Sequence, residues 1–285
     1  MFKIVEKRLL APDIWLMNVE APRVAHSAQP GQFVIVRGPE DGERIPLTVA
    51  DYDREKGTVS IVIQAVGAST RKIVAIGQGE CLADFAGPLG QPSEFIHEDI
   101  ESLRGKKFLF IAGGVGAAPV YPQVKWLHEH GIQADVIVGA RNKDMLIIID
   151  ELRKIAGNLY ISTDDGSEGF HGNVTALMKD LIDNRGKRYD EVVTIGPMIM
   201  MKFVALATKE YGIHTIASLN TLMIDGTGMC GACRVSIGGK MKFACVDGPE
   251  FDASLINFDE AMRRQGMYKN KEKIADHRCR IGRDQ

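Results

Sequence analysis

The sequence contains no run of about 18 apolar residues, so no segment is long enough to span a bilayer. It also lacks an excess of one charge, because 35 Lys and Arg stand against 37 Asp and Glu, for a formal net charge of −2. This balance argues against binding to nucleic acid or to an anionic membrane surface. Residues 1–7 carry charges where a secretion signal needs an apolar core, and we therefore expect a cytoplasmic protein without membrane insertion.

Cysteine is scarce, and the five cysteines are an odd number crowded toward one end of the chain. This distribution does not fit a disulfide framework and favours metal ligation in a reducing compartment. No combination of a nucleophile, a base and an acid stands out, so we assign no catalytic residue. With 285 residues and 45% hydrophobic content, the chain is large enough for two or three domains with ordinary cores.

The first part of the chain, residues 1–98, is predicted to form a small antiparallel β-barrel, because short β-rich segments alternate with turn residues. One short helix is expected at Ser69–Ile76, and Gly87–Gly90 is expected to be a turn that closes the barrel. The expected strands are Phe2–Leu9, Ile14–Val19, Phe33–Arg37 and Thr58–Val66.

Two motifs in this part suggest more than an all-β module without chemistry. Arg44-Ile-Pro-Leu-Thr48 places a cation, a rigid Pro and a hydroxyl at a strand start, and Gly67-Ala-Ser-Thr70 opens the helix, where free backbone amides can hold phosphate. In this order, and with the turn Pro30-Gly-Gln-Phe33, they resemble the flavin-binding domain of the ferredoxin reductase family.

That resemblance implies an FAD site on the barrel. Arg44 would contact the diphosphate, the next motif residues would contact the flavin ring, and Thr48 would hydrogen-bond its reactive edge. The helix start would hold the pyrophosphate. The full set that the resemblance implies is Arg44, Pro46, Leu47, Thr48, Gln64, Val66, Gly67, Ser69 and Thr70.

Residues 99–220 are predicted to form a doubly wound, parallel α/β domain, because strands and helices alternate after the apolar run Lys107–Ala112. The further expected strands are Ala134–Gly139, Asn158–Thr163, Glu191–Ile195 and His214–Ser218. The expected helices are Tyr121–His130, Asp144–Ala156, Asn173–Leu181 and Met198–Glu210.

Glycine-rich loops follow several of these strands, where the carboxyl ends of a parallel sheet usually bind ligands. Gly113-Gly-Val-Gly-Ala-Ala-Pro119 is not the usual Gly-x-Gly-x-x-Gly fingerprint and by itself could be a structural turn. It resembles the nicotinamide-domain signature of the same reductase family. The implied NAD(H) contacts are Gly113, Gly114, Gly116, Ala118, Pro119, Gly139, Ala140, Arg141, Gly196, Pro197 and Met198.

Asp164 and Asp165 follow the strand Asn158–Thr163 and favour NAD over NADP, because two carboxylates would repel a 2′-phosphate. Two alternatives remain open. The two residues could be ordinary solvated loop residues, and Arg141 could lie close enough to favour NADP instead.

A third part, residues 221–285, contains Asp225-Gly-Thr-Gly-Met-Cys-Gly-Ala-Cys233, with Cys245 further on. The spacing fits the 2Fe–2S pattern Cys-x4-Cys-x2-Cys with a distant fourth ligand, if Asp225 replaces the first cysteine. The predicted metal ligands are thus Asp225, Cys230, Cys233 and Cys245. A zinc site, merely buried thiols, and a fourth ligand such as Asp247 or an exogenous group remain alternatives. Cys81 and Cys279 are not expected to bind metal.

The order of barrel, nucleotide domain and 2Fe–2S module resembles the small electron-transfer subunits related to that of dihydroorotate dehydrogenase. Asp in the first ligand position is similar to the small subunits of NADH-dependent ferredoxin:NADP oxidoreductases. The resemblance implies FAD, NAD(H) and a 2Fe–2S cluster, a heterodimer with a larger flavin and iron–sulfur subunit, and ferredoxin and NADP(H) reached through that partner.

Other functions stay possible. A subunit of dihydroorotate dehydrogenase, or of a sulfide dehydrogenase or hydrogenase relative, would share these parts. A non-catalytic, zinc-stabilised sensor of nucleotide or redox state is the alternative from another class. The charged tail is expected to be a solvated surface or a segment that docks on a partner.

Overall fold

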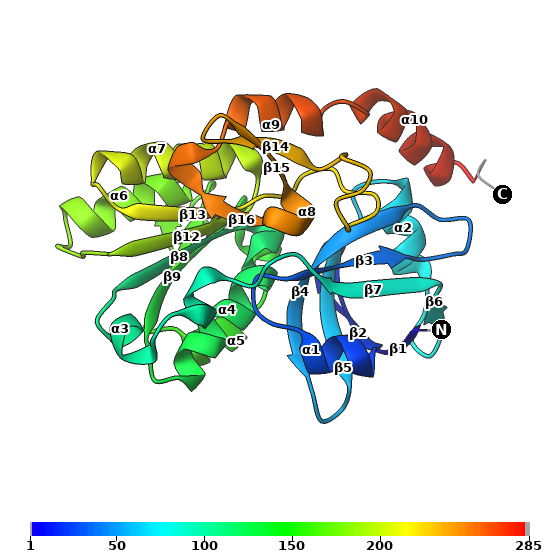
Figure 1. The fold of residues 1–285 in the computed structure, drawn as a ribbon, viewed down its shortest axis with the longest axis horizontal. Coiled ribbons are helices and arrows are strands. Elements are labelled where there is room, and N and C mark those ends of the chain that lie inside the picture. The colour runs from blue at the N-terminus through cyan, green and yellow to red at the C-terminus, as the bar shows by residue number, and fades with distance from the viewer. Residues whose placement is uncertain (1, 283–285) are drawn as a thin grey trace.

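A computed structural model describes residues 2–282 and shows a β-barrel beside a layered α/β part, with the C-terminal segment lying across both (Figure 1). The barrel is a nearly closed sheet of seven strands in the order β6-β1-β2-β5-β4-β3-β7, and all its pairings are antiparallel. Its strands are β1 (Phe2–Ala11), β2 (Ile14–Glu20), β3 (Phe33–Arg37), β4 (Arg44–Asp53), β5 (Thr58–Gln64), β6 (Cys81–Leu82) and β7 (Asp84–Leu89).

The predicted barrel is confirmed, with three local differences. The motif that begins at Arg44 continues as the ten-residue strand β4. Helix α1 (Pro22–Ser27) was not expected, whereas helix α2 (Ala68–Ala75) matches the predicted helix closely. The predicted turn at Gly87–Gly90 is wrong, since residues 87–89 belong to strand β7, whose Leu89 pairs with Phe33 of β3 beyond a register shift. Gly and Pro usually interrupt strands, but here β7 lies at the edge of the sheet order, where Pro is tolerated.

The second part is a doubly wound sheet in the order β11-β10-β9-β8-β12-β13-β16. Six of its strands are parallel, and the short β16 is antiparallel to β13. The central strand β8 is buried along its whole length, as expected for a strand covered on both faces. The strands are β8 (Phe108–Gly113), β9 (Ala134–Ala140), β10 (Asn158–Thr163), β11 (Phe170–His171), β12 (Glu191–Ile195), β13 (His214–Ser218) and β16 (Glu250–Asp252).

Helices cover both faces of this sheet. One face packs against apolar side chains of α3, α4 and α5, and the other against α6 and α7. All four helices predicted here are present; α4 begins at residue 117, inside the predicted loop, and α5 is shorter than expected. The helices are α3 (Ile100–Arg104), α4 (Ala117–Glu129), α5 (Ile149–Ile155), α6 (Val174–Asp183) and α7 (Met198–Glu210), with short 3₁₀ turns η1 (Glu94–His97), η2 (Gly114–Gly116) and η3 (Lys143–Met145).

The C-terminal part does not form a separate sheet of any size. Its hairpin lies between Cys233, just before β14, and Cys245 in α8; its strand β16 completes the α/β sheet, and two helices follow. Its elements are β14 (Arg234–Ile237), β15 (Lys240–Phe243), α8 (Ala244–Asp247), β16, η4 (Ala253–Leu255), α9 (Phe258–Gln265) and α10 (Lys269–Arg280).

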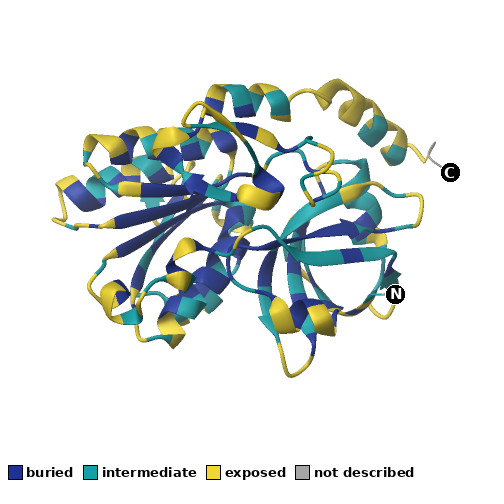
Figure 2. Cartoon of the chain, viewed as in Figure 1, coloured by how far each residue is buried: buried dark blue, intermediate teal, exposed yellow. Residues whose placement is uncertain are grey.

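The three parts share apolar cores and therefore pack as one body. One core joins Ala11 and Ile14 of the barrel to α3, α4 and the sheet. Another joins Phe33 and Ile35 of the barrel to α7, β13 and the cysteine-bearing segment. Figure 2 shows these buried regions in dark blue, continuous across the boundary between barrel and sheet. None of the helices within residues 2–282 has the length and apolarity needed to cross a membrane.

Candidate functional site

Strand β4 presents the first predicted flavin motif on two faces. In the antiparallel register, Thr48 lies opposite Phe33 and Pro46 lies opposite Ile35. Leu47 packs instead against the core inside the barrel. Because side chains alternate along a strand, Arg44, Pro46 and Thr48 share the outer face, and Leu47 could reach a ligand there only through its backbone.

The second flavin motif, at the start of α2, is already engaged in local hydrogen bonds. The Thr70 hydroxyl accepts from the Gly67 amide at 3.0 Å and donates to the Gly67 carbonyl at 2.9 Å. The Ser69 hydroxyl donates to the carboxylate of Glu43, the residue before Arg44. The two motifs therefore lie together, but Glu43 is an anion at the place where the motif predicts a phosphate.

The Gly113–Pro119 segment lies at the carboxyl end of β8, as predicted, but its glycines have different roles. A side chain at Gly116 would place Cβ 2.1 Å from the Ile195 carbonyl oxygen, and one at Gly113 would lie 2.4 Å from the sulfur of Met200. These glycines therefore allow the β8–α4 turn to pack against the β12–α7 turn. Only Gly114, with φ of +55°, faces open space.

The remaining predicted nucleotide residues also lie at this edge of the sheet. Gly113 pairs in register with Gly139, and Ala140 pairs with Thr163, so the loops after β8, β9 and β10 are neighbours. The Asp165 amide donates to the Arg141 carbonyl at 3.2 Å, which places the backbone of the β10 loop beside that of the exposed Arg141. Gly196, Pro197 and Met198 follow β12 on the other side of β8.

The structure brings two of the predicted metal ligands together. The sulfur atoms of Cys233 and Cys245 are 3.2 Å apart, and both residues are buried. Burial, and after it the Cys233 thiol, raises the pKa of Cys245 to about 12, while a backbone hydrogen bond from Gly228 opposes that rise. Asp225 accepts from the Thr227 hydroxyl at 2.6 Å, and this contact lowers the pKa of its carboxyl.

The other two ligands lie on the same loop but not against this pair. Cys230 is exposed, and its amide donates to Asp225 Oδ2 at 3.4 Å. Among residues 2–282, no three His, Cys, Asp or Glu side chains surround a single point. A two-iron cluster divides its ligands between two ions, and three thiols with one carboxylate on a loop of positive-φ glycines suit such a group.

Asp247, the alternative fourth ligand, has a structural role in this hairpin. Its carboxylate accepts from the Phe243 amide at 2.7 Å and from Lys242 Nζ at 3.1 Å. These two bonds lower the pKa of Asp247 and fix the turn between β15 and α8. Its involvement there favours Asp225 as the carboxylate ligand.

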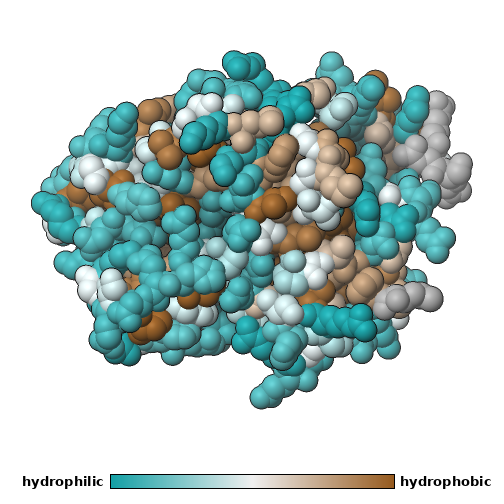
Figure 3. Space-filling model, in the orientation of Figure 1, coloured by the Kyte–Doolittle hydropathy of each residue, from teal (hydrophilic) through white to brown (hydrophobic). Residues whose placement is uncertain are grey.

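The cysteine loop packs directly on the outer face of the barrel. A Cβ at Gly226 would lie 2.8 Å from Leu89 Cδ1 and 2.9 Å from Ile35 Cγ1, so only glycine permits this approach. Ile35 is the neighbour of Pro46 on that face. The predicted flavin surface and the predicted cluster loop are therefore continuous, and Figure 3 shows apolar side chains gathered where the barrel meets the C-terminal part.

Sequence reasoning missed a polar contact where the three parts meet. Glu250 of β16 accepts from Gln123 Nε2 of α4 at 2.8 Å, and the hydroxyl of Ser93, in the segment between barrel and sheet, lies beside the same carboxyl. Burial raises the pKa of Glu250 to about 7. These residues are up to 157 positions apart, and no local motif marks them.

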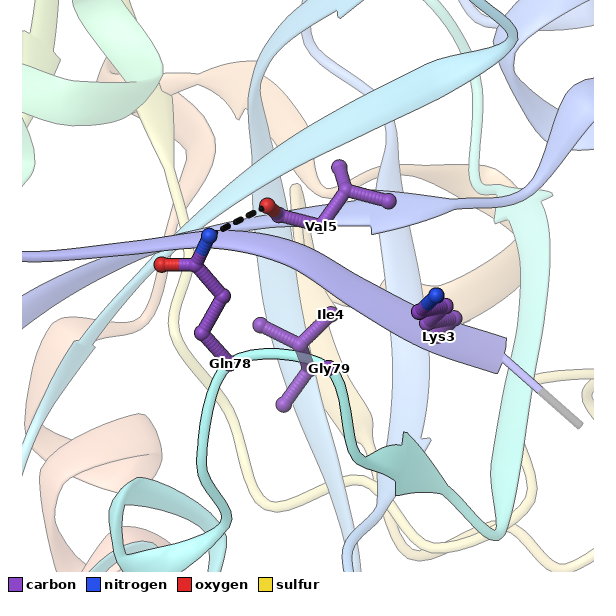
Figure 4. A pocket seen from close by; sticks show the side chains of 5 residues that line it. All are labelled: Lys3, Ile4, Val5, Gln78 and Gly79. Carbon is purple, nitrogen blue, oxygen red and sulfur yellow. Dashed lines mark hydrogen bonds between the residues drawn. The ribbon is translucent and has the colours of Figure 1, made fainter.

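A shallow hollow lies away from all of these residues. Figure 4 shows it between β1 and the turn before β6, where Gln78 Nε2 donates to the Val5 carbonyl at 3.0 Å. None of its lining residues belongs to a predicted motif. Its lining consists of Lys3, Ile4, Val5, Gln78 and Gly79.

Comparison with known proteins agrees with this arrangement. The model of the iron–sulfur cluster binding domain of dihydroorotate dehydrogenase B matches residues 220–257. The dihydroorotate dehydrogenase B (NAD(+)) electron transfer subunit homologue of Thermotoga maritima is 44% identical over 97% of this chain and 94% of its own length. A Clostridium beijerinckii protein described as uncharacterised, in the adh 3′ region, is 64% identical over 95% of this chain and 92% of its own.

One solved structure is similar over nearly the whole fold. It is a chain of an NADH-dependent reduced ferredoxin–NADP oxidoreductase, a structure described as giving insights into flavin-based electron bifurcation. The TM-score is 0.89 at 42% identity, and the match covers 98% of this chain and 97% of the other.

Proposed function

This chain belongs to the family of dihydroorotate dehydrogenase B electron-transfer subunits, and we propose that it carries electrons between NAD(H) and a larger partner subunit. When bound, FAD exchanges a hydride with NAD(H) and releases electrons singly, and a 2Fe–2S cluster carries single electrons onward. The observation that carries this proposal is the contact of the cysteine loop, at Gly226, with the barrel face that presents Pro46 and Thr48.

The residues of this chain have binding and positioning roles in the proposal. Arg44, Pro46 and Thr48 would hold FAD on the outer face of β4, and the α2 start would hold its diphosphate, a role that requires the Ser69–Glu43 hydrogen bond to open. Gly114 and the loops after β9, β10 and β12 hold the nicotinamide nucleotide. Asp225, Cys230, Cys233 and Cys245 hold the cluster.

The exposed apolar residues around the cysteine loop support docking of the partner there. Met229 is 89% exposed next to Cys230, and Ile224 and Val246 flank the loop with 51% and 41% exposure. Side chains of this kind usually become covered in a stable complex. The loop that would hold the cluster therefore lies at the surface where the partner is proposed to dock.

We further propose that the complex is a bifurcating NADH-dependent ferredoxin:NADP oxidoreductase, in which ferredoxin and NADP(H) react on the partner. The extent of the match to the solved oxidoreductase chain supports this assignment, as does the carboxylate in the first ligand position. The second candidate is electron transfer to a dihydroorotate dehydrogenase, which the family relationship supports.

The absorption spectrum of the purified protein tests the first part of the proposal. Flavin and iron–sulfur bands that both bleach on addition of NADH are expected, and a colourless zinc protein would refute it. Two additions to the co-purified complex separate the candidate functions. A spectral change on adding NADPH with ferredoxin supports the ferredoxin:NADP oxidoreductase, and a change on adding dihydroorotate supports the dihydroorotate dehydrogenase.

The Asp225→Cys variant tests the fourth ligand, with Asp247→Cys as its matched control. If Asp225 is a ligand, its replacement by thiolate shifts the cluster spectrum and midpoint potential, whereas Asp247→Cys, which loosens the β15–α8 turn, can lower the cluster content but leaves the spectrum and potential of the bound cluster unchanged. A shift in the control alone would assign the site to Asp247 instead.

A further inference from the structure

The last helix, α10, crosses from the cysteine-bearing part to the barrel. The preceding helix α9 packs on α7, and Lys202 of α7 pairs with Asp259 of α9 at 2.7 Å. After the turn at residues 266–268, α10 runs over α2, the helix whose start is the proposed diphosphate site (Figure 1). One continuous segment therefore links the proposed cluster module to the proposed flavin site.

Hydrophobic burial does not hold α10 in this position. None of its 12 residues is buried, and Ile274 is 55% exposed. Figure 2 shows the helix mostly in the colour of exposed residues. Its seven charged residues other than histidine comprise five cations and two anions, Glu272 and Asp276.

An ion pair fastens α10 to α2. Arg71 Nε lies 2.8 Å from Asp276 Oδ1, and the two side chains are only 26% and 16% exposed. Asp276 Oδ2 also accepts from Arg280 Nε at 2.8 Å, one turn further along α10, so the carboxylate is held from two sides. The hydrogen bond from Arg71 is the main cause that lowers the pKa of the Asp276 carboxyl. The positive charges of Arg280 and Arg71 lower it further.

The same short helix is tied on its other side to the flavin motif. Ser69 bonds to Glu43 next to Arg44, and Ile73 packs against the barrel core. Residues 69 and 73 thus face the barrel, and Arg71 points the opposite way, toward α10. Helix α2 is clamped between the strand that carries Arg44 and the C-terminal helix.

We propose that α10 is a strap that retains the flavin dinucleotide, and that Asp276 is a positioning residue that acts through Arg71. The fastened strap holds the first turn of α2, with its free amides, in the geometry that receives the diphosphate, and it slows the opening through which the dinucleotide leaves. This inference rests on the proposed FAD site. It assigns to the C-terminal helix a role in cofactor retention at helix α2, more than 190 residues earlier in the chain.

The test measures the rate at which fluorescent FAD is released from purified full-length protein after rapid gel filtration. An ion pair of this partial exposure is expected to change the release rate by about two- to five-fold. Asp276→Asn should speed release by this factor, and Asp276→Glu should restore the original rate. Arg71→Gln should match Asp276→Asn, and the double variant should be no faster than either, because both changes open the same pair.

Asp259→Asn is the matched control, since it breaks another ion pair of the C-terminal segment far from α2, and it should leave the release rate unchanged. Hydrogen exchange of the amides of residues 269–280 supplies a second reading and should accelerate in Asp276→Asn and Arg71→Gln but not in Asp259→Asn. Slower release from Asp276→Asn would overturn the strap and make Arg71 a direct diphosphate ligand that Asp276 competes for. Unchanged release despite faster exchange would also overturn it. A wild-type protein without FAD would refute the proposed function itself.

Discussion

The buried carboxyl group of Glu250 should make the free energy of unfolding depend on pH. It lies where β16, α4 and the segment after the barrel meet, and its partners there, Gln123 and Ser93, are neutral. Because burial raises its pKa to about 7 from the ordinary 4.5, the folded protein holds a proton that the unfolded chain releases. Below pH 4.5 both states are protonated, and stability does not depend on this group.

Between pH 4.5 and about 7 the unfolded chain ionises while Glu250 stays protonated in the fold, so the folded state loses stability as pH rises. At about 1.4 kcal/mol per pH unit the full loss is about 3 kcal/mol. Since part of the residue reaches solvent, we expect about 2 kcal/mol. Above about pH 7 the loss is complete and constant.

The assay compares urea unfolding of wild type and Glu250→Gln at pH 5 and pH 8. The glutamine keeps the contact with α4 but cannot ionise, so the variant should gain about 2 kcal/mol relative to wild type between the two pH values. Glu129→Gln, an exposed position on the same helix as Gln123, should show no such gain. A difference between wild type and Glu250→Gln that is the same at both pH values would refute the reasoning.

The other predictions concern four glycines and one carboxylate. Gly226→Ala crowds the barrel face, whereas Gly238→Ala, also at a positive φ, has room for Cβ and carries only backbone strain, so the first variant alone should purify with reduced iron and sulfide, and its Tm should fall further than that of the second. Gly116→Ala should cost about 1–3 kcal/mol of unfolding free energy through overpacking, and Gly114→Ala about 1 kcal/mol through backbone strain alone; equal losses in thermal melts would contradict the packing role. Asp164→Asn should lower the ratio of kcat/KM for NADH over NADPH by a few fold, and an unchanged ratio would show that this carboxylate does not face the ribose.

The regular elements of the fold follow from local sequence. The strands Phe33–Arg37, Asn158–Thr163 and Glu191–Ile195 and the helix Met198–Glu210 have the predicted bounds, because each combines a clear apolar pattern with turn residues at its ends. The local apolar pattern is enough to predict such segments, without knowledge of their contacts with distant parts of the chain. The order of the three parts follows for the same reason.

The elements that were missed depend on distant partners. Strand β7 carries Gly87 and Pro88, which locally indicate a turn, yet pairing with β3 makes it a strand. Strand β16 has three residues and exists only as an edge of a sheet formed much earlier in the chain. Helix α10 was expected only as a charged tail, and its position depends on an ion pair to residue 71.

The residues predicted to form the site lie at strand ends and in loops, as the sequence indicated, but their ligand contacts stay a prediction, and the packing gives some of them a structural role. The glycine motif after β8 was interpreted as a cradle for phosphate. Gly113 and Gly116 allow two strand–helix turns to pack together, and a Cβ at Gly196 would lie 3.1 Å from Gly113 Cα in the facing turn. Glycines in a motif of this kind can serve the close packing of neighbouring turns as well as the approach of a ligand.

The close packing of Gly113 and Gly116 limits where a nucleotide can contact this motif. Gly114 faces open space, whereas Gly113 and Gly116 are buried against the β12–α7 turn, so the backbone around Gly114 is where a diphosphate could approach this motif. The side chains that distinguish one nucleotide from another must then come from the adjacent strand ends, where Arg141 lies beside Asp165. Affinity and specificity would therefore reside on different strands, so a variant at Asp164 or Arg141 can alter the choice of nucleotide without disturbing the packed turns that hold the sheet together.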